Sequence, residues 1–495
     1  MKRLIFTVVA LCLTLMVTAQ VESDWSRKVK DMHESNMRNY DEYRQQVLQD
    51  YESFRQQINA DYAHFMEEAW QHFDSHPAEE SPMLPKPPQP VVADPQDHPT
   101  ADPIPYDLVP IAPKPIEPII ESPQPIEPII YTPKPEETVQ TIKFYGTDMQ
   151  FHLDRTKQIK LDDATEKSVA KLWNQLSVPY FDNLIADCLA NRKQFNLCDW
   201  AYIMLTEQVA ETICGGHTNE AATLHMYLLT QSGYQVRLAR ANMKQLSVLI
   251  GTTETIYHYK FFTIDGIKYY NFDHSLDDAL FHIFNHAFPQ EKTMSLTISQ
   301  PKFAVNLTGP RTITSKRFPS VSVSVSANKN LIDFYNSYPL NAQWNYYSMA
   351  SLSSTMKDKL YPMLRKAIAG KSQSEAANII INFVQTGLDY ATDQDQFGYE
   401  RPLFPDESLY YPFCDCEDRS ILYTCLIREL MGLDAVLLDY PDHLATAVRF
   451  TDRVAGDYLD IDGERYIICD PTYIGAEIGR CMPHYKSVRP KIQKF

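Results

Sequence analysis

A proline-rich segment over 81–137 limits the fold of this chain more than any other feature. It contains the related stretches APKPIEPII and SPQPIEPIIYTPKP. Proline lacks a backbone N–H and has a fixed φ, so a segment this rich in proline forms neither a helix nor a central strand. The sequence therefore predicts an extended linker over 81–137, with folded regions only before and after it.

The region before the linker, 20–80, has the pattern of one long helix. Aromatic residues recur every eleven positions in YDEYRQQVLQD, YESFRQQINAD and YAHFMEEAWQH, which begin at Tyr40, Tyr51 and Tyr62. Eleven residues fill three turns at about 3.67 residues per turn, so the rings form one stripe along the helix. Self-association, packing on the rest of the chain, or a specific partner helix would each cover this stripe.

The N-terminus, 1–19, has the features of a secretory signal peptide. Lys2 and Arg3 precede an apolar run, and the small-residue stretch VTA stands before Gln20. The run is too short to cross a bilayer and no second long apolar stretch follows, so we expect no transmembrane segment and a secreted or periplasmic protein. The formal net charge of −17 becomes more negative without Lys2 and Arg3, which argues against nucleic acid as a partner.

The remainder of the chain contains an internal repeat. The stretch TIDGIKYYNFD, which ends at Asp273, matches DIDGERYIICD, which ends at Asp470. Before each of them comes an apolar-periodic helix that ends at a glycine and leads into a run typical of a strand. We therefore predict an α+β fold with two copies of one domain, over 138–300 and 301–495.

The stretch CDCEDRS places Cys416 at or near the start of the helix in the second copy. Free N–H groups and the positive end of the helix dipole stabilise a thiolate there, so Cys416 is a candidate nucleophile. His443 follows at the start of an alternating strand and is the candidate base. Asp470 follows a later strand and can orient the imidazole. Taken singly, a structural thiol, a satisfied histidine and a turn-capping aspartate are the alternatives.

In this order, D-C-E-D-R-S, a histidine with alternating apolar residues, and D-P-T resemble the transglutaminase-like superfamily, which has the papain-like cysteine proteinase fold. The resemblance covers 331–495 well and the first copy weakly, and implies tandem transglutaminase-like domains. It also implies that Cys416 attacks an amide carbonyl, that His443 transfers the proton and that Asp470 orients His443. The family includes acyltransferases, peptidases and glycopeptide amidases, so the fold does not choose among them.

The first copy, 138–300, lacks this set of residues. Aligned on the shared glycines, the nucleophile position holds His217 and the base position holds no histidine, while the aspartate is kept as Asp273. We therefore expect a degenerate domain that serves as a scaffold or a docking surface. A shifted triad of Cys214, His258 and Asp273 is the alternative.

A thiolate nucleophile requires no metal or other cofactor. Some periplasmic proteases of the resembled family bind calcium through acids beside the cysteine, so the resemblance implies calcium as a candidate ligand of Asp415 and Glu417. Charged capping of the helix that contains Asp418 is the alternative. Cys414 and Cys481 are a pair to test for a disulfide in an oxidising compartment.

The sequence leads to one preferred function and two alternatives. We expect an exported cysteine enzyme that acts on peptide or protein amide bonds, with hydrolysis preferred to transfer because water is abundant outside the cell. A protein-glutamine acyltransferase that crosslinks proteins is the first alternative. A non-catalytic binding or scaffold protein is the second.

Overall fold

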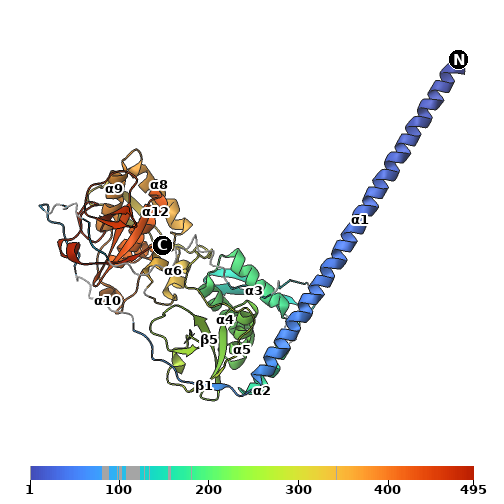
Figure 1. Ribbon diagram of the computed structural model, residues 1–495, viewed down its shortest axis with the longest axis horizontal. Helices are drawn as coiled ribbons and strands as arrows, with labels where there is room; N and C mark the ends of the chain where they lie inside the picture. Colours follow the sequence, from blue (N-terminus) through green and yellow to red (C-terminus); the bar gives the residue numbers. More distant parts are fainter. Residues whose placement is uncertain are drawn as a thin grey trace.

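The structure is a computed structural model. It describes residues 2–80, 89–96, 99, 103–106, 123–126, 129–132, 134–153, 158–179, 181–341 and 343–494, with the backbone alone over 2–26. The fold mixes helices and antiparallel sheets in two lobes, and a long helix projects from one lobe (Figure 1). The side chains of the predicted signal peptide, 1–19, lie outside the described residues.

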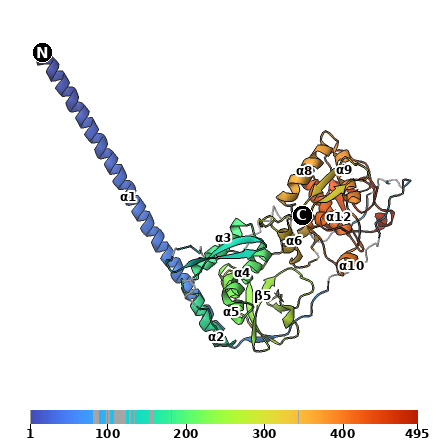
Figure 2. The ribbon, with the colours of Figure 1, turned by 180° about the vertical axis from the view of Figure 1, so that it is seen from behind.

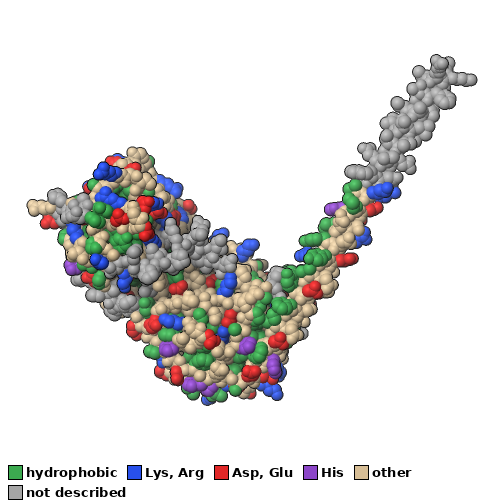
Figure 3. All heavy atoms as spheres, in the orientation of Figure 1, with side chains coloured by type: hydrophobic (Ala, Val, Ile, Leu, Met, Phe, Trp, Pro, Cys, Tyr) green, Lys and Arg blue, Asp and Glu red, His purple; other side chains and the backbone are tan. Residues whose placement is uncertain are grey.

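Helix α1 (Lys2–Met66) is continuous, and only its C-terminal end lies on the body, beside α2 (Glu166–Leu176) (Figure 2). There Tyr62 is buried, with its ring 5.0 Å from that of Trp173. Four aromatic side chains nearer the N-terminus are exposed: Tyr40, Tyr43, Tyr51 and Phe54. Figure 3 shows hydrophobic side chains along this projecting part. The body thus covers one end of the stripe, and self-association through the rest stays a prediction. Within the described residues, no helix is both long and apolar enough to cross a membrane.

The first half of the body, 138–300, contributes five strands to a six-stranded antiparallel sheet, and the sixth strand comes from before the linker. The strand order is β1 (Gln71–Phe73), β8 (Phe281–Phe284), β4 (Val236–Ala241), β5 (Gln245–Thr252), β7 (Ile267–Asn271) and β6 (Phe261–Ile264). The other elements are the hairpin β2 (Thr138–Phe144) and β3 (Thr147–Leu153), α3 (Asp182–Gln194), α4 (Asp199–Cys214), α5 (Asn219–Gln231) and the 3-10 turn η1 (His274–Leu276). The hydroxyl of Thr218 accepts the Ala221 N–H and caps α5, which packs between α4 and the sheet.

The second half, 301–495, contains a five-stranded antiparallel sheet. The strand order is β13 (Tyr458–Ile461), β14 (Glu464–Cys469), β12 (His443–Arg449), β11 (Asp434–Tyr440) and β15 (Lys491–Gln493). The other elements are β9 (Arg311–Thr314), β10 (Ser322–Val325), α6 (Lys329–Asn336), α7 (Trp344–Met349), α8 (Ser354–Ile368), α9 (Gln373–Gly387), α10 (Asp393–Gln396), α11 (Pro405–Tyr410), α12 (Cys416–Met431) and η2 (Pro483–Ser487). Helix α12 packs against α7, α9, α11 and the sheet, and ends at Gly432, whose φ of 64° favours glycine.

The two sheets share one strand order. Strands β8, β4, β5, β7 and β6 follow one another as β15, β11, β12, β14 and β13 do, and α5 packs on β4 and β5 as α12 packs on β11 and β12. Across the first hairpin Ala241 faces Gln245, and across the second Tyr440 faces His443. Gln245 therefore stands at the position that His443 has in the second half.

Described parts of the predicted linker, 81–137, lie on the body. The N–H of Ile104 donates to the Tyr458 carbonyl at 2.7 Å, and the Ile104 side chain is buried against the second sheet. A side chain at Gly233 would clash with the backbone of Gln124, so the linker also crosses the first half closely. In this segment a single apolar residue between prolines, Ile104, is buried against the body.

Candidate functional site

Three elements of the second half bring the sequence-predicted residues together. Cys416 is the first residue of α12, His443 is the first residue of β12, and Asp470 follows β14. Strands β12 and β14 are neighbours, and Thr446 pairs with Cys469. In this register His443 and Asp470 lie on the same face of the sheet. Helix α12 packs against β12, which brings Cys416 next to the ring of His443.

His443 and Asp470 form a buried pair. Nε2 of His443 lies 3.0 Å from Oδ2 of Asp470. The other carboxylate oxygen accepts the N–H of Thr472 at 2.8 Å and that of Tyr473 at 3.2 Å, which fix its position. Burial lowers the pKa of His443, but Asp470 and the Cys416 sulfur outweigh it and raise the pKa to about 10. Both neighbours therefore favour the charged form of the ring, which forms when His443 takes the proton of Cys416.

The Cys416 thiol is closed off from solvent. The residue is 1% exposed, and its Sγ donates to Oε2 of Glu417 at 3.2 Å. Nδ1 of His443 is buried and has no hydrogen-bond partner among the described residues, although the sulfur is near enough to raise the pKa of the ring. Rotation of the thiol from Glu417 toward Nδ1 would pair the sulfur with the ring.

Aromatic side chains cover this site. Trp344 is half-buried and packs against a small apolar cluster of Cys416, Leu437 and Leu444. The ring of Tyr485 is stacked on that of His443, with centroids 5.1 Å apart and planes at 17°. A peptide reaches the thiol only when part of this cover moves.

Carboxylates gather beside Cys416, and two of them were missed from the sequence. Ligand oxygens of Asp393, Glu400, Asp415 and Glu417 all lie within 4.8 Å of one another. An oxygen-only set of carboxylates suits a hard cation such as calcium. Burial, together with the charges of Asp415 and Asp393, raises the pKa of Asp418 well above its usual range. The residues therefore fit calcium. The acid-rich stretch TDQDQFGYE around Asp393 was the available signal.

Helix capping, the alternative role for these acids, is observed for Asp418. Oδ2 of Asp418 accepts the Asp415 N–H at 3.2 Å at the start of α12. The candidate disulfide is not formed: Cys414 and Cys481 are both free, and they belong to different apolar clusters.

The first half places other groups at the equivalent positions. His217 stands just before α5, Gln245 begins β5, and Asp273 follows β7. Nε2 of Gln245 donates to Oδ2 of Asp273 at 3.4 Å, and Nε2 of His217 lies 3.4 Å from the same oxygen. The first half therefore keeps the aspartate, but it has neither a thiol at the position of Cys416 nor an imidazole at the position of His443.

The shifted triad of the first half is not assembled. Nδ1 of His258 pairs with Glu80 at 3.4 Å, away from Asp273. Burial, together with the charge of Glu220, raises the pKa of Cys214 to about 12, so this thiol stays protonated.

Comparison with protein-family models, with curated proteins and with solved structures finds no match for this chain. The class that fold and site define is an α+β protein with a buried cysteine, histidine and aspartate at a helix–sheet junction.

Proposed function

We propose that the second half is an exported, transglutaminase-like cysteine enzyme that hydrolyses amide bonds of peptides or proteins. The observation that carries this proposal is the buried pair of His443 and Asp470 beside Cys416. One ring nitrogen is held by a carboxylate, and the other has no partner and adjoins the thiol. A cysteine that serves only packing needs neither group.

In the proposed reaction, Cys416 gives its proton to Nδ1 of His443 and its sulfur attacks the amide carbon. The C–N bond then breaks, the leaving nitrogen takes the proton from the imidazolium, and a thioester remains. Water gives a proton to His443 while its oxygen attacks the thioester, and the released thiolate recovers that proton. Asp470 orients the ring and stabilises its charge, and the first N–H groups of α12 are the donors for the oxyanion.

A second candidate is acyl transfer to an amine, such as a lysine side chain. One observation favours it: the burial that hides Cys416 also keeps water away from a thioester. Product analysis in the presence of a primary amine separates the two, because transfer gives a new amide and hydrolysis gives a free acid.

The proposal includes a calcium ion that is bound by the carboxylates of Asp393, Glu400, Asp415 and Glu417. A bound calcium ion supplies positive charge to these carboxylates, including the one that accepts the Cys416 thiol. At a hundredfold excess over its dissociation constant, calcium should raise the free energy of unfolding by about 2.7 kcal/mol. Thermal unfolding with calcium or magnesium measures this. The shift should vanish in Glu417→Gln, and an equal shift there would exclude this site.

The test of function uses the chain from Gln20 onward with a library of fluorogenic peptide amides. We expect Cys416→Ala to abolish turnover with little change in thermal unfolding. Cys214→Ala is the matched control, because it removes another incompletely exposed thiol outside the site, and it should leave turnover unchanged. Equal activity of Cys416→Ala and wild type would end the proposal.

A further inference from the structure

The first half contains a cavity at the position that corresponds to the second half's site. It has a volume of about 400 Å³ and lies between α4, α5 and the start of β5. Its wall includes Glu207, Glu211, His217, His225 and Asp273. Glu207 and His217 are exposed, Glu211 and Asp273 are partly buried, and His225 is buried, so the group runs from solvent into the cavity.

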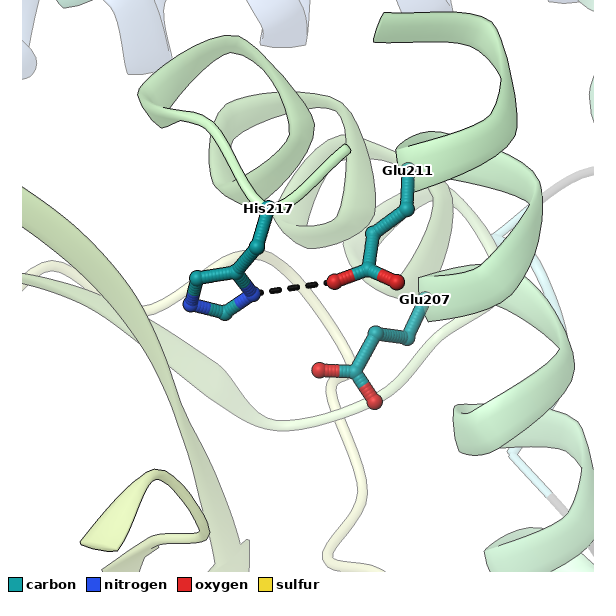
Figure 4. A group of neighbouring side chains, drawn as sticks. All are labelled: Glu207, Glu211 and His217. Carbon is teal, nitrogen blue, oxygen red and sulfur yellow. Dashed lines mark hydrogen bonds and ion pairs between the residues drawn. The ribbon is translucent and has the colours of Figure 1, made fainter. Parts of the chain in front are cut away.

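Three of these side chains converge on one point (Figure 4). Glu207 and Glu211 are one turn apart on α4, so they share a helix face. His217 reaches them from the loop before α5, with Nδ1 2.9 Å from Oε1 of Glu211. One ligand atom from each residue lies within 4.8 Å of the others, so a small movement of the side chains brings all three onto one small cation.

A second carboxylate orients the histidine from the other side. Nε2 of His217 lies 3.4 Å from Oδ2 of Asp273. Asp273 is itself fixed, because its Oδ1 accepts the N–H of Ser275 at 2.9 Å and its hydroxyl at 2.6 Å. A histidine that binds a metal through one ring nitrogen commonly has a carboxylate hydrogen-bonded to its other ring nitrogen.

An independent observation points to a ligand in the same cavity. His225, on α5, lines the cavity, is only 6% exposed, and its Nε2 has no hydrogen-bond partner among the described residues. Burial lowers the pKa of His225 to about 3, so the ring is neutral. A neutral, buried ring nitrogen without a partner in a polar cavity is costly unless a bound group or its water shell contacts it.

We propose that the first half binds a divalent transition-metal ion, with Zn²⁺ the best fit, through Glu207, Glu211 and Nδ1 of His217. Asp273 acts as the orienting group behind His217. The imidazole and the small number of ligands disfavour calcium and magnesium, which require more oxygen ligands or retained water. Three protein ligands leave a coordination position open to the cavity, as in zinc sites that bind water or a small ligand.

Protons should compete with the metal. Although solvent reaches Glu207 through the cavity, desolvation by the surrounding protein and the charge of Glu211 raise its pKa to about 7. The hydrogen bond to Glu211 also raises the pKa of His217, with a contribution from Asp273. Metal ligands bind in the deprotonated form, so the affinity should fall as the pH is lowered.

Calorimetric titration of the full chain with ZnCl₂ tests the proposal. The Cys416→Ala background is used throughout, because the thiol and His443 would otherwise form a competing site. We expect one ion per chain, an affinity at least about 100-fold weaker in His217→Ala, and about 10- to 100-fold weaker in Asp273→Asn. His33→Ala, which removes an exposed histidine of α1, is the control and should bind as the background does.

Two results would overturn the proposal: no saturable Zn²⁺ binding, or unchanged affinity in His217→Ala. Thermal unfolding of each variant shows whether it is folded. Glu207→Gln keeps the side-chain shape and serves as a second variant, which should weaken binding and reduce its pH dependence. Full retention of affinity in Glu207→Gln would mean that the cluster is a set of ion pairs only.

Discussion

The two halves of the molecule place an aspartate at the same point of the same sheet, and the difference lies in what faces it. In the second half Asp470 accepts the N–H two residues ahead at 2.8 Å, and in the first half Asp273 does so at 2.9 Å. This turn gives each aspartate a structural task, so its presence alone does not indicate catalysis. The chemical difference is the group beside the carboxylate. Asp470 has the imidazole of His443 at 3.0 Å, whereas Asp273 has the side-chain amide of Gln245 at 3.4 Å.

Access differs as much as composition does. Cys416 and His443 are covered by aromatic rings, whereas His217 is exposed at the mouth of a cavity lined by acids. One architecture thus places a buried thiol beside a histidine in one half and an acid-lined cavity with an exposed histidine in the other. A helix–sheet junction sets the positions, and the side chains set the chemistry.

The largest expected effect separates the two histidines. His443→Ala should lower turnover of a peptide amide by about 1000-fold or more, because it removes the base that activates Cys416. His217→Ala should change it by less than about twofold, since the first half has no thiol beside that ring. Steady-state rates on one short peptide measure both. A large loss in His217→Ala would show that the halves do not divide the work as proposed.

The pH dependence of stability should show the same contrast. Burial lowers the pKa of His443, but Asp470 and Cys416 raise it to about 10, against about 6.5 in the unfolded chain. The charged pair therefore stabilises fully below about pH 6.5, and its contribution is lost as pH rises toward 10. Over this range we expect wild type to lose on the order of 3 kcal/mol more than His443→Gln in urea unfolding. If the free energy of unfolding changed equally with pH in the two proteins, the pair of His443 and Asp470 would not stabilise the fold to this extent.

Much of the local structure could be predicted from the sequence. The α+β class followed from periodicity, and the motifs correctly indicated Cys416 at a helix start and His443 at a strand start. The repeated IDG turns lie between β6 and β7 and between β13 and β14, because both are tight hairpins with residues of positive φ at Asp265 and Asp462.

Contacts between distant segments could not be predicted in this way. Asp393 and Glu400 join Asp415 only through the tertiary fold, so no local pattern links them. The pair Glu207 and Glu211 has the spacing of an ordinary solvated helix face, and only the position of His217 gives it another meaning. Likewise, proline content predicts an extended backbone and says nothing of the surface on which it docks.

A smaller effect is expected at the cover of the second site. Trp344→Ala removes a half-buried ring that packs beside Cys416, which should favour opening by about 1 to 2 kcal/mol and speed alkylation of Cys416 about tenfold. Iodoacetamide labelling followed by mass spectrometry measures the rate at each cysteine. Labelling of Cys214 in the same sample is the internal control and should not change. An unchanged Cys416 rate would mean that another group closes the site.

The smallest effect is expected from an attempt to convert the first half. In a Cys416→Ala background, His217→Cys with Gln245→His gives the first half a thiol and an imidazole at the equivalent sequence positions. Residue 217 lies two positions before the first residue of α5, whereas Cys416 is the first residue of α12. The new thiol would therefore lack the helix N–H groups that stabilise a thiolate and an oxyanion. Glu207 and Glu211 would also oppose a negative sulfur there, since like charges raise a thiol pKa. We expect turnover to rise by less than about twofold over the inactive background. Substantial recovery would show that the first half differs from the second only in its side chains, and that the position of the helix start is not what separates them.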